Sequence, residues 1–146
     1  MIDQLREELE IDEGVKYEIY LDHLGLKTCG VGHLVRKTDP EHDMEVGDPV
    51  SKERVAELFA QDIGWTMNDC LKLLPDFDML PEPARLIVCN MMFNMGINRM
   101  GMFKRFLAAI EDRNWQEAAI EMADSRWHNQ VPERSGRLIA RMRALT

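Results

Sequence analysis

The segment IDEGVKYEIYLDHLGLKTCGVGHL, residues 11–34, contains the change of pattern that decides the fold. Apolar residues recur at helical spacing up to this segment, and Gly14 is a natural stop, so we expect an amphipathic helix over residues 3–13. Beyond it, aromatic and branched residues predict a strand over 17–22, a turn at HLG, and a second strand over 26–32. No other part of the chain predicts a sheet convincingly.

The remainder of the chain predicts helices. Residues 36–50 are polar, carry two prolines and lack periodicity, which indicates a loop. Ser51 is a plausible N-cap for a helix of more than 20 residues, and a nearly all-apolar segment over 84–95, stopped by Gly96, predicts a buried central helix. Three shorter helices are expected over 100–112, 115–124 with Asn114 as its cap, and 132–144.

These elements predict a single α+β domain, mostly α-helical, over residues 1–146. We expect a small β-hairpin lobe at about 14–55 and a connecting helix at about 51–73. A larger helical lobe would cover about 75–146, with the helix 3–13 packed on it. No internal repeat or low-complexity tract is visible.

Composition excludes several classes of protein. With 146 residues, 45% of them hydrophobic, the chain can bury a core without metals or disulfides, so intrinsic disorder is ruled out. No apolar stretch reaches the roughly 20 residues of a membrane span, and charged residues stand where a signal peptide has its apolar core. Three cysteines without a paired motif predict reduced thiols.

Charge is distributed unevenly along the chain. The formal net charge is −8, and all of the excess lies in residues 1–50, which hold 13 acidic and 5 basic residues. The last 22 residues form a basic patch with five arginines and one glutamate. A pI near 5.0 and the absence of interleaved aromatic residues argue against nucleic-acid binding.

Glu13, Asp22 and Thr28 form the candidate catalytic group. A short helix-to-hairpin connection can bring them around one small cavity, which suits glycoside hydrolysis by a protonated carboxyl and an ionised carboxylate. Glu13 would face the negative end of a helix macrodipole, which disfavours its ionised form, whereas Asp22 beside an open turn should stay charged. Thr28 offers a hydroxyl that can hold a water. Spacing alone leaves open a merely solvated acidic lobe.

Residues 11–34 resemble the catalytic segment of the lysozymes of T-even bacteriophages, glycoside hydrolase family 24. The resemblance extends in colinear order to LFAQD at 58–62, NMMFNMG at 90–96 and WQEAAIEMADSRWHNQVPERSGR at 115–137. It implies a lysozyme-like fold and an endo-acting muramidase. Such an enzyme cuts the β-1,4 bond between N-acetylmuramic acid and N-acetylglucosamine of peptidoglycan, with inversion at the anomeric carbon.

The resemblance also implies roles for single residues. Glu13 matches the family's acid, and Asp22 and Thr28 match its water-positioning pair. Arg134 matches an arginine that pairs with the glutamate and would oppose the helix-end effect. The resemblance further implies that Leu34, Phe93 and Asn94 line the saccharide cleft. It also implies a structural ion pair between His33 and Asp62.

Three implied substrate positions differ from the family pattern. Asn94 stands where T-even members have a glutamine, so the amide is kept with a shorter reach. Phe106 and Glu121 replace small polar side chains, which puts their subsites in doubt.

Competing interpretations are less favoured. A metal site built from Asp22, His23, His33 and His42 lacks ligand spacing, so we expect no metal and no cofactor. Core packing explains Trp127, Trp115 and the methionines at 91, 92 and 95 better than a sugar platform or a binding surface does. A catalytically silent wall-binding or virion-structural module, and a cytosolic partner-binding protein, remain alternatives.

The implied partner is the glycan strand of peptidoglycan. We expect a monomer without stable membrane association, made in the host cytoplasm and released to the cell wall through a separate holin. T-even members are strongly basic, and the acidity of this chain is its main departure from them.

Overall fold

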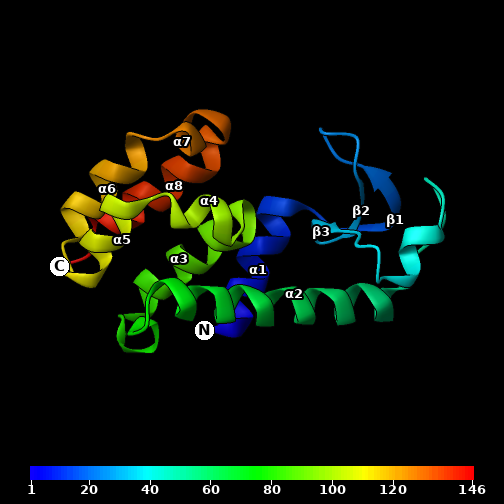
Figure 1. The fold of residues 1–146 in the computed structure, drawn as a ribbon, viewed down its shortest axis with the longest axis horizontal. Coiled ribbons are helices and arrows are strands. Elements are labelled where there is room, and N and C mark those ends of the chain that lie inside the picture. Colours follow the sequence, from blue (N-terminus) through cyan, green and yellow to red (C-terminus); the bar gives the residue numbers. More distant parts are fainter. The chain divides into compact units, whose positions relative to one another are not determined.

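The computed structural model describes all residues from Met1 to Thr146, and the chain forms two compact units. One unit comprises Ile2–Trp65, and the other comprises Thr66–Thr146 together with Met1. The boundary lies inside the long helix α2 (Lys52–Leu73) (Figure 1). The α+β class with a helical majority is confirmed, whereas the packing of residues 3–13 on the helical lobe stays a prediction.

The first unit begins with α1 (Ile2–Glu13), which ends at the residue that the sequence predicts. Its apolar stripe is buried at Leu5 and Leu9. Gly14 ends the helix with a positive φ of 75°, and its N–H donates to the carbonyl of Glu10. The chain therefore leaves α1 directly after the carboxyl group of Glu13 and enters the sheet (Figure 1).

The sheet is antiparallel in the order β1 (Lys16–Leu21), β2 (Lys27–Gly30) and β3 (His33–Leu34). The hairpin is confirmed, but the predicted second strand over 26–32 is too long. Gly30 and Gly32 have φ values of 62° and 59°, so the chain turns there and His33 pairs back onto Cys29. This turn produces a third strand that was not predicted.

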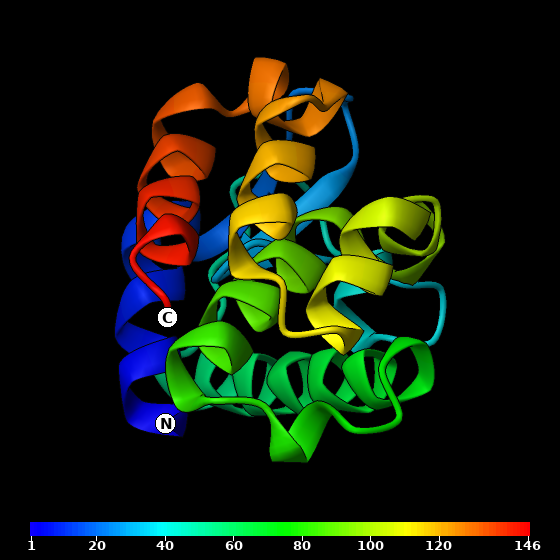
Figure 2. The same cartoon turned by 90° about the vertical axis from the view of Figure 1, so that its left-hand side faces the viewer.

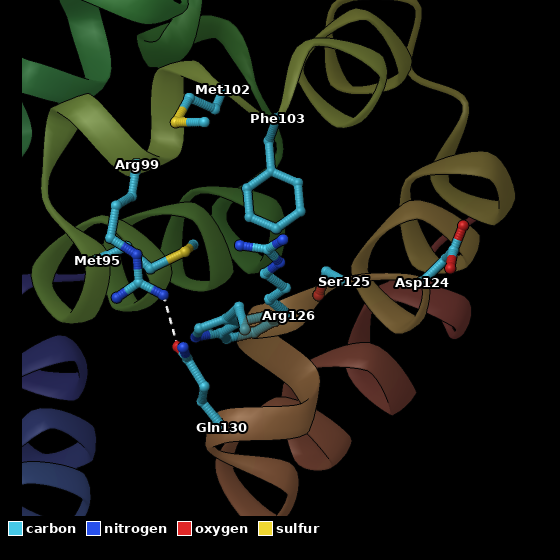
Figure 3. A pocket seen from close by; sticks show the side chains of 9 residues that line it. Met95, Arg99, Met102, Phe103, Asp124, Ser125, Arg126 and Gln130 are labelled. Atoms are coloured by element: carbon cyan, nitrogen blue, oxygen red, sulfur yellow. Dashed lines mark hydrogen bonds between the residues drawn. The ribbon is translucent and has the colours of Figure 1, made fainter.

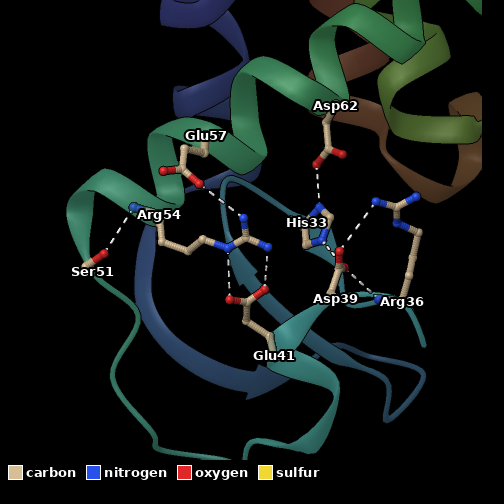
Figure 4. Close-up of polar contacts among 8 residues, drawn as sticks. All are labelled: His33, Arg36, Asp39, Glu41, Ser51, Arg54, Glu57 and Asp62. Atoms are coloured by element: carbon tan, nitrogen blue, oxygen red, sulfur yellow. Dashed lines mark hydrogen bonds and ion pairs between the residues drawn. The ribbon is translucent and has the colours of Figure 1, made fainter.

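The loop between β3 and α2 is irregular, as predicted, except for one 3-10 turn, η1 (Pro40–Asp43), and an antiparallel bridge between Pro49 and Glu18 of β1. Glu41 in this turn is buried and accepts two hydrogen bonds from the guanidinium of Arg54, at 3.0 and 2.9 Å (Figure 4). The predicted cap of α2 is confirmed, because Ser51 Oγ accepts from the N–H of Arg54 at 3.1 Å. Two fixed contacts therefore join this loop to the start of α2.

The second unit is built around α3 (Glu82–Met95), the predicted central helix, which buries nine of its residues. The helices that follow it are α4 (Ile97–Gly101), α5 (Lys104–Glu111), α6 (Trp115–Ala123), α7 (Arg126–Gln130) and α8 (Pro132–Arg143). Helix α6 packs against α5 and α8 (Figure 2). The predicted core residues Trp115 and Trp127 are buried, as are all three methionines of α3.

The prediction for this unit is wrong for one helix and misses another. The helix expected over 100–112 is divided, because the chain leaves helical geometry at Phe103 between α4 and α5. Helix α7 was not predicted, since five residues are too few to show a periodic stripe. The cap of α6 is as predicted, with Asn114 Oδ1 accepting from the N–H of Glu117 at 3.1 Å. None of the helices combines the length and apolar character that a bilayer span requires.

Candidate active site

Glu13, Asp22 and Thr28 all belong to the first unit. Glu13 is the last residue of α1, Asp22 follows β1 directly, and Thr28 lies in β2. The two carboxyl groups therefore come from the ends of the consecutive elements α1 and β1. The hydroxyl comes from β2, which pairs with β1.

Asp22 is held by the turn that joins β1 and β2. Its Oδ1 accepts from the N–H of Leu24 at 2.8 Å and from the N–H of Leu26 at 2.9 Å. These hydrogen bonds, the one from Leu26 foremost, lower the pKa of Asp22 below its ordinary value. Asp22 is therefore ionised at neutral pH.

Thr28 is almost fully buried, with 5% of its surface exposed. Its Oγ1 donates to the carbonyl of Leu26 at 2.9 Å. Because the hydroxyl proton is engaged, the lone pairs of Oγ1 are left to accept a hydrogen bond from a water molecule. The turn thus fixes both the Asp22 carboxylate and the direction of the Thr28 hydroxyl.

Tyr20, Thr28 and Leu34 form one row across the three strands. Thr28 pairs with Tyr20 on β1 and with Leu34 on β3, and directly paired residues of an antiparallel sheet share a face. The Leu34 side chain is 49% exposed, so this row ends in an apolar surface open to a ligand. That position agrees with the predicted saccharide contact, which stays a prediction.

Gly32 makes room for the carboxyl group of Glu13. A Cβ atom at Gly32 would lie 2.7 Å from Glu13 Oε2, closer than real Cβ atoms approach other atoms, and in tight contact with its Cδ at 3.1 Å. Glu13 therefore lies against the bare backbone of the turn between β2 and β3. The sequence places this glycine at the end of the predicted second strand, and no pattern in the sequence indicates its contact with Glu13.

Tyr20 lies near both carboxyl groups. Burial raises the pKa of its phenol, and the negative charges of Glu13 and Asp22 raise it further, so the hydroxyl is neutral at any ordinary working pH. The ammonium of Lys16 stands 4.2 Å from the centre of its ring. Tyr20 was not predicted as part of the site, although its predicted strand pairs with the strand of Thr28.

His33 is held between two carboxylates. Its Nδ1 lies 2.6 Å from Asp62 Oδ2 and its Nε2 lies 2.8 Å from Asp39 Oδ2 (Figure 4). Burial of the ring favours its neutral form, but the hydrogen bonds to Asp62 and Asp39 outweigh burial and raise the pKa of His33. The expected contact with Asp62 is present. Asp39, which also accepts from the N–H of Arg36, was missed.

The other residues singled out by the sequence belong to the second unit. Asn94 Oδ1 accepts from Trp127 Nε1 at 2.7 Å, so its carbonyl is engaged within the protein. Arg134 is buried and donates from Nε to Asn90 Oδ1 at 2.8 Å. Its pairing with Glu13 and the saccharide contacts of Asn94 and Phe93 stay predictions.

The two altered subsite positions differ in exposure. Phe106 is fully buried and packs edge-to-face on Phe103, with ring centres 5.9 Å apart, so it serves the core. Glu121 in α6 is partly exposed. No three His, Cys, Asp or Glu side chains converge as metal ligands would.

Comparison with known proteins relates the whole chain to one family. A family model described as phage lysozyme matches residues 10–144. Probable T4-type lysozyme 2 of Dictyostelium discoideum is 32% identical over 159 residues, which cover 96% of this chain and 94% of that protein. The pre-baseplate central spike protein Gp5 of Enterobacteria phage T4 is 28% identical over 92% of this chain and 26% of its own length. Peptidoglycan hydrolase gp36 of Pseudomonas phage phiKMV is 28% identical over 94% of this chain and 15% of its own length.

Proposed function

Since the chain belongs to the phage lysozyme family, we propose that it cuts peptidoglycan strands internally, at the β-1,4 bond between N-acetylmuramic acid and N-acetylglucosamine, with inversion at the anomeric carbon. It is a glycoside hydrolase that acts on peptidoglycan. The family membership supports hydrolysis of peptidoglycan, and the specific bond and the inversion at the anomeric carbon are proposed in addition.

One observation carries the mechanism. The turn over residues 22–26 holds the Asp22 carboxylate through two N–H groups and also engages the proton of the Thr28 hydroxyl. An ionised carboxylate and an accepting hydroxyl oxygen are the two groups needed to orient a water molecule. The sheet presents them in the same unit as the carboxyl group of Glu13.

In the proposed reaction, the Glu13 carboxyl donates its proton to the glycosidic oxygen as the bond from that oxygen to the anomeric carbon breaks. A water donates one hydrogen bond to Thr28 Oγ1 and the other to Asp22. Its oxygen attacks the anomeric carbon from the opposite face, and its proton passes to Asp22. Attack from that face converts the β linkage into a product with the α configuration.

The remaining residues would position the substrate and the acid. Leu34, Phe93 and Asn94 would contact saccharide units, and Arg134 would pair with the Glu13 carboxylate after proton transfer. Leu34 supports this assignment through its exposure. The ion pair of His33 with Asp62 is structural, because both ring nitrogens of His33 are already engaged by carboxylates.

In the cell, we propose that the protein is made in the host cytoplasm, acts as a monomer, and reaches the wall through a holin pore to cause lysis. Membership of the phage lysozyme family supports this role. A second candidate is a wall-cutting or silent module of a phage particle, and it is favoured by the similarity to part of the T4 central spike protein.

Mass spectrometry of the products tests the proposed bond. Purified peptidoglycan digested with the protein should yield fragments with N-acetylmuramic acid at the new reducing end. N-acetylglucosamine there would instead indicate a glucosaminidase, and a 1,6-anhydro end would indicate a transglycosylase. Proton NMR of the first products should show the α anomer, and an initial β anomer would overturn the inverting mechanism. No cleavage at all would favour the silent module.

A further inference from the structure

Trp65 is the one tryptophan of the chain whose ring is open to solvent. It is 42% exposed, whereas Trp115 and Trp127 are 6% and 2% exposed. Trp127 lines the pocket of the second unit shown in Figure 3, and its Nε1 donates to Asn94. Folding buries most of a large aromatic ring, because its apolar surface contributes much to the hydrophobic free energy. An indole left exposed on α2 is therefore a candidate for contact with a ligand.

Arg36 covers one face of this ring. Its guanidinium carbon lies 3.9 Å from the centre of the Trp65 indole, a distance at which a cation is attracted to the ring face. Nη2 of Arg36 makes a long hydrogen bond of 3.4 Å to Asp39 Oδ1, and the buried Nε has no hydrogen-bond partner within the protein. Because Arg36 occupies one face, the exposed area of Trp65 lies on the other face and on the edges of the ring.

The Arg36–Trp65 pair lies close to Leu34, the exposed apolar residue at the end of the sheet. Arg36 follows Leu34 by two residues, so their Cα atoms are at most about 7 Å apart. The N–H of Val35 between them still donates to the carbonyl of Lys27 on β2 at 3.0 Å, which ties this part of the chain to the sheet. All of these residues belong to the first unit. A glycan strand in contact with Leu34 can therefore also reach the indole.

The chemistry of the pair suits an amino-sugar unit of a polyanionic strand. An indole offers a flat apolar surface to the C–H face of a sugar ring, and a guanidinium beside it donates hydrogen bonds to acetamido, hydroxyl and carboxylate oxygens. Arg36 and the exposed Lys37 are also two of the five basic residues in 1–50, which hold 13 acidic ones. They offer an anionic strand favourable charges within an otherwise acidic part of the chain.

We propose that the Arg36–Trp65 pair binds the glycan strand of peptidoglycan one sugar beyond the unit that Leu34 contacts. The sugar ring would pack on the indole, and Arg36 would donate to its oxygen substituents. The inference rests on the proposed function, which makes the glycan strand the substrate. Because the pair lies outside the reacting groups, it holds the strand equally before and during bond cleavage, which lowers KM and leaves kcat unchanged. Long strands gain from this contact, whereas the shortest strands that the enzyme cuts do not reach it.

Quenching of tryptophan fluorescence by acrylamide tests the contact directly. The probe is a peptidoglycan glycan strand freed of its peptides by an amidase, added to the Glu13→Gln variant so that it stays intact during the measurement. A bound strand should shield Trp65 from acrylamide, whereas Trp115 and Trp127 are buried with or without it. Adding Trp65→Phe to this variant should abolish the strand-dependent change, because the exposed fluorophore is then gone.

Affinities and rates separate a direct contact from a structural role. Trp65→Ala should weaken binding of long strands by about three- to tenfold and raise KM on them by the same factor, whereas Trp65→Phe should keep most of the affinity. The kcat/KM of Trp65→Ala on the shortest strand that wild type cuts should stay unchanged. The matched control is Tyr17→Ala, which removes another exposed ring of the first unit with a cation over it, the ammonium of Lys52 at 5.9 Å. Lys52 lies roughly 20 Å along α2 from Trp65, so this control should bind long strands as wild type does.

The outcomes separate this contact from the proposed function. A bound strand that leaves Trp65 unshielded, or equal losses of affinity in Trp65→Ala and Tyr17→Ala, would overturn the contact. A loss of the same size on short and long strands would overturn it too. None of these results would affect the muramidase assignment, which depends on the release of reducing ends by wild type. Shielding of Trp65 by strands that wild type does not cut would support the contact and contradict the muramidase.

Discussion

At the scale of single residues, the close approach of Gly32 to Glu13 is the feature on which the site depends most. The turn between β2 and β3 brings backbone to the carboxyl group, with no space for a methyl group between them. Residue 32 also has a φ of 59°, a conformation that side chains disfavour. Both requirements fall on the same residue.

We predict that Gly32→Ala lowers activity by about 100-fold, because the new Cβ displaces the Glu13 carboxyl group. The left-handed backbone adds about 1–2 kcal/mol of destabilisation. Reducing-end release and urea unfolding measure the two effects separately. Gly47→Ala is the matched control, since Gly47 has a φ of 93° in the same unit but has nothing within 4 Å of an added Cβ. The account predicts that this control loses stability and keeps activity, and equal losses of activity in both variants would contradict it.

At the scale of elements, His33 fastens the loop and α2 to the sheet. Its ring on β3 contacts Asp39 from the loop before η1 and Asp62 from α2. Arg54 on α2 and Glu41 in η1 make a second link between the same helix and loop. The segment over 35–51 is therefore fixed by these charged pairs together with backbone hydrogen bonds between its residues 47–50 and β1.

The link through His33 predicts a stability that depends on pH. The pKa of His33 is raised in the folded state, so protonated His33 stabilises the fold. This stabilisation is complete below the pKa of about 6.5 that the residue has in the unfolded chain, and it is lost as pH rises through the folded pKa. The pKa of Asp39 is lowered despite its burial, by hydrogen bonds from Arg36 and His33. The stabilisation that the Asp39 carboxylate gives the folded state is present above about pH 4 and is lost as pH falls through its folded pKa.

Asp39→Asn should therefore cost about 1–3 kcal/mol of unfolding free energy at pH 5.5. The cost should be clearly smaller at pH 9 than at pH 5.5, because the stabilisation by protonated His33 is lost as pH rises. Urea unfolding at the two pH values measures the difference. Asp43→Asn, which changes an exposed carboxylate in the adjacent turn η1, should have little effect at either pH. A cost that is the same at both pH values would contradict the charged link.

The elements that the sequence predicted well carry strong local signals. Helices α1, α2 and α3 have apolar stripes with a glycine stop or a hydroxyl cap, such as Gly14, Ser51 and Gly96. The missed elements, β3 and α7, have two and five residues, too few for periodicity to show. An element could therefore be predicted only where it is long enough for its periodic pattern to show.

The candidate site was predicted by resemblance at Glu13, Asp22 and Thr28, and the structure adds how these side chains are held. Gly32 and Asp39 could not be predicted, because their importance arises from contacts across space. Asp39 lies in an aperiodic loop, and no pattern links it to His33. Strand register could have indicated Tyr20, which pairs with Thr28.

At the scale of the whole molecule, the net charge of −8 is carried by residues 1–50, which include Glu13 and Asp22. Peptidoglycan in a bacterial wall is polyanionic, so this end of the chain is repelled by its substrate. Exposed charges act over about 8 Å at physiological ionic strength, and salt shortens that range further. The repulsion should affect encounter with the wall and leave the chemical step unchanged.

We predict that lytic activity rises when salt increases from low to moderate ionic strength. Turbidity clearance of cells measures lysis, and release of reducing ends from short soluble glycans is the control, which should change little. A steady fall of clearance over the same range would contradict the prediction and would indicate attraction between the protein and the wall.

The central claim is that Glu13 is the acid of a peptidoglycan hydrolase, and one comparison tests it most directly. Purified peptidoglycan is incubated with wild type, Glu13→Gln and Glu10→Gln, and new reducing ends are counted. Glu10 lies on the same helix and is exposed, so its variant removes a similar charge. The account predicts that Glu13→Gln reduces release by about 10²–10⁴-fold while Glu10→Gln releases as much as wild type. Release by Glu13→Gln at the rate of wild type would contradict it.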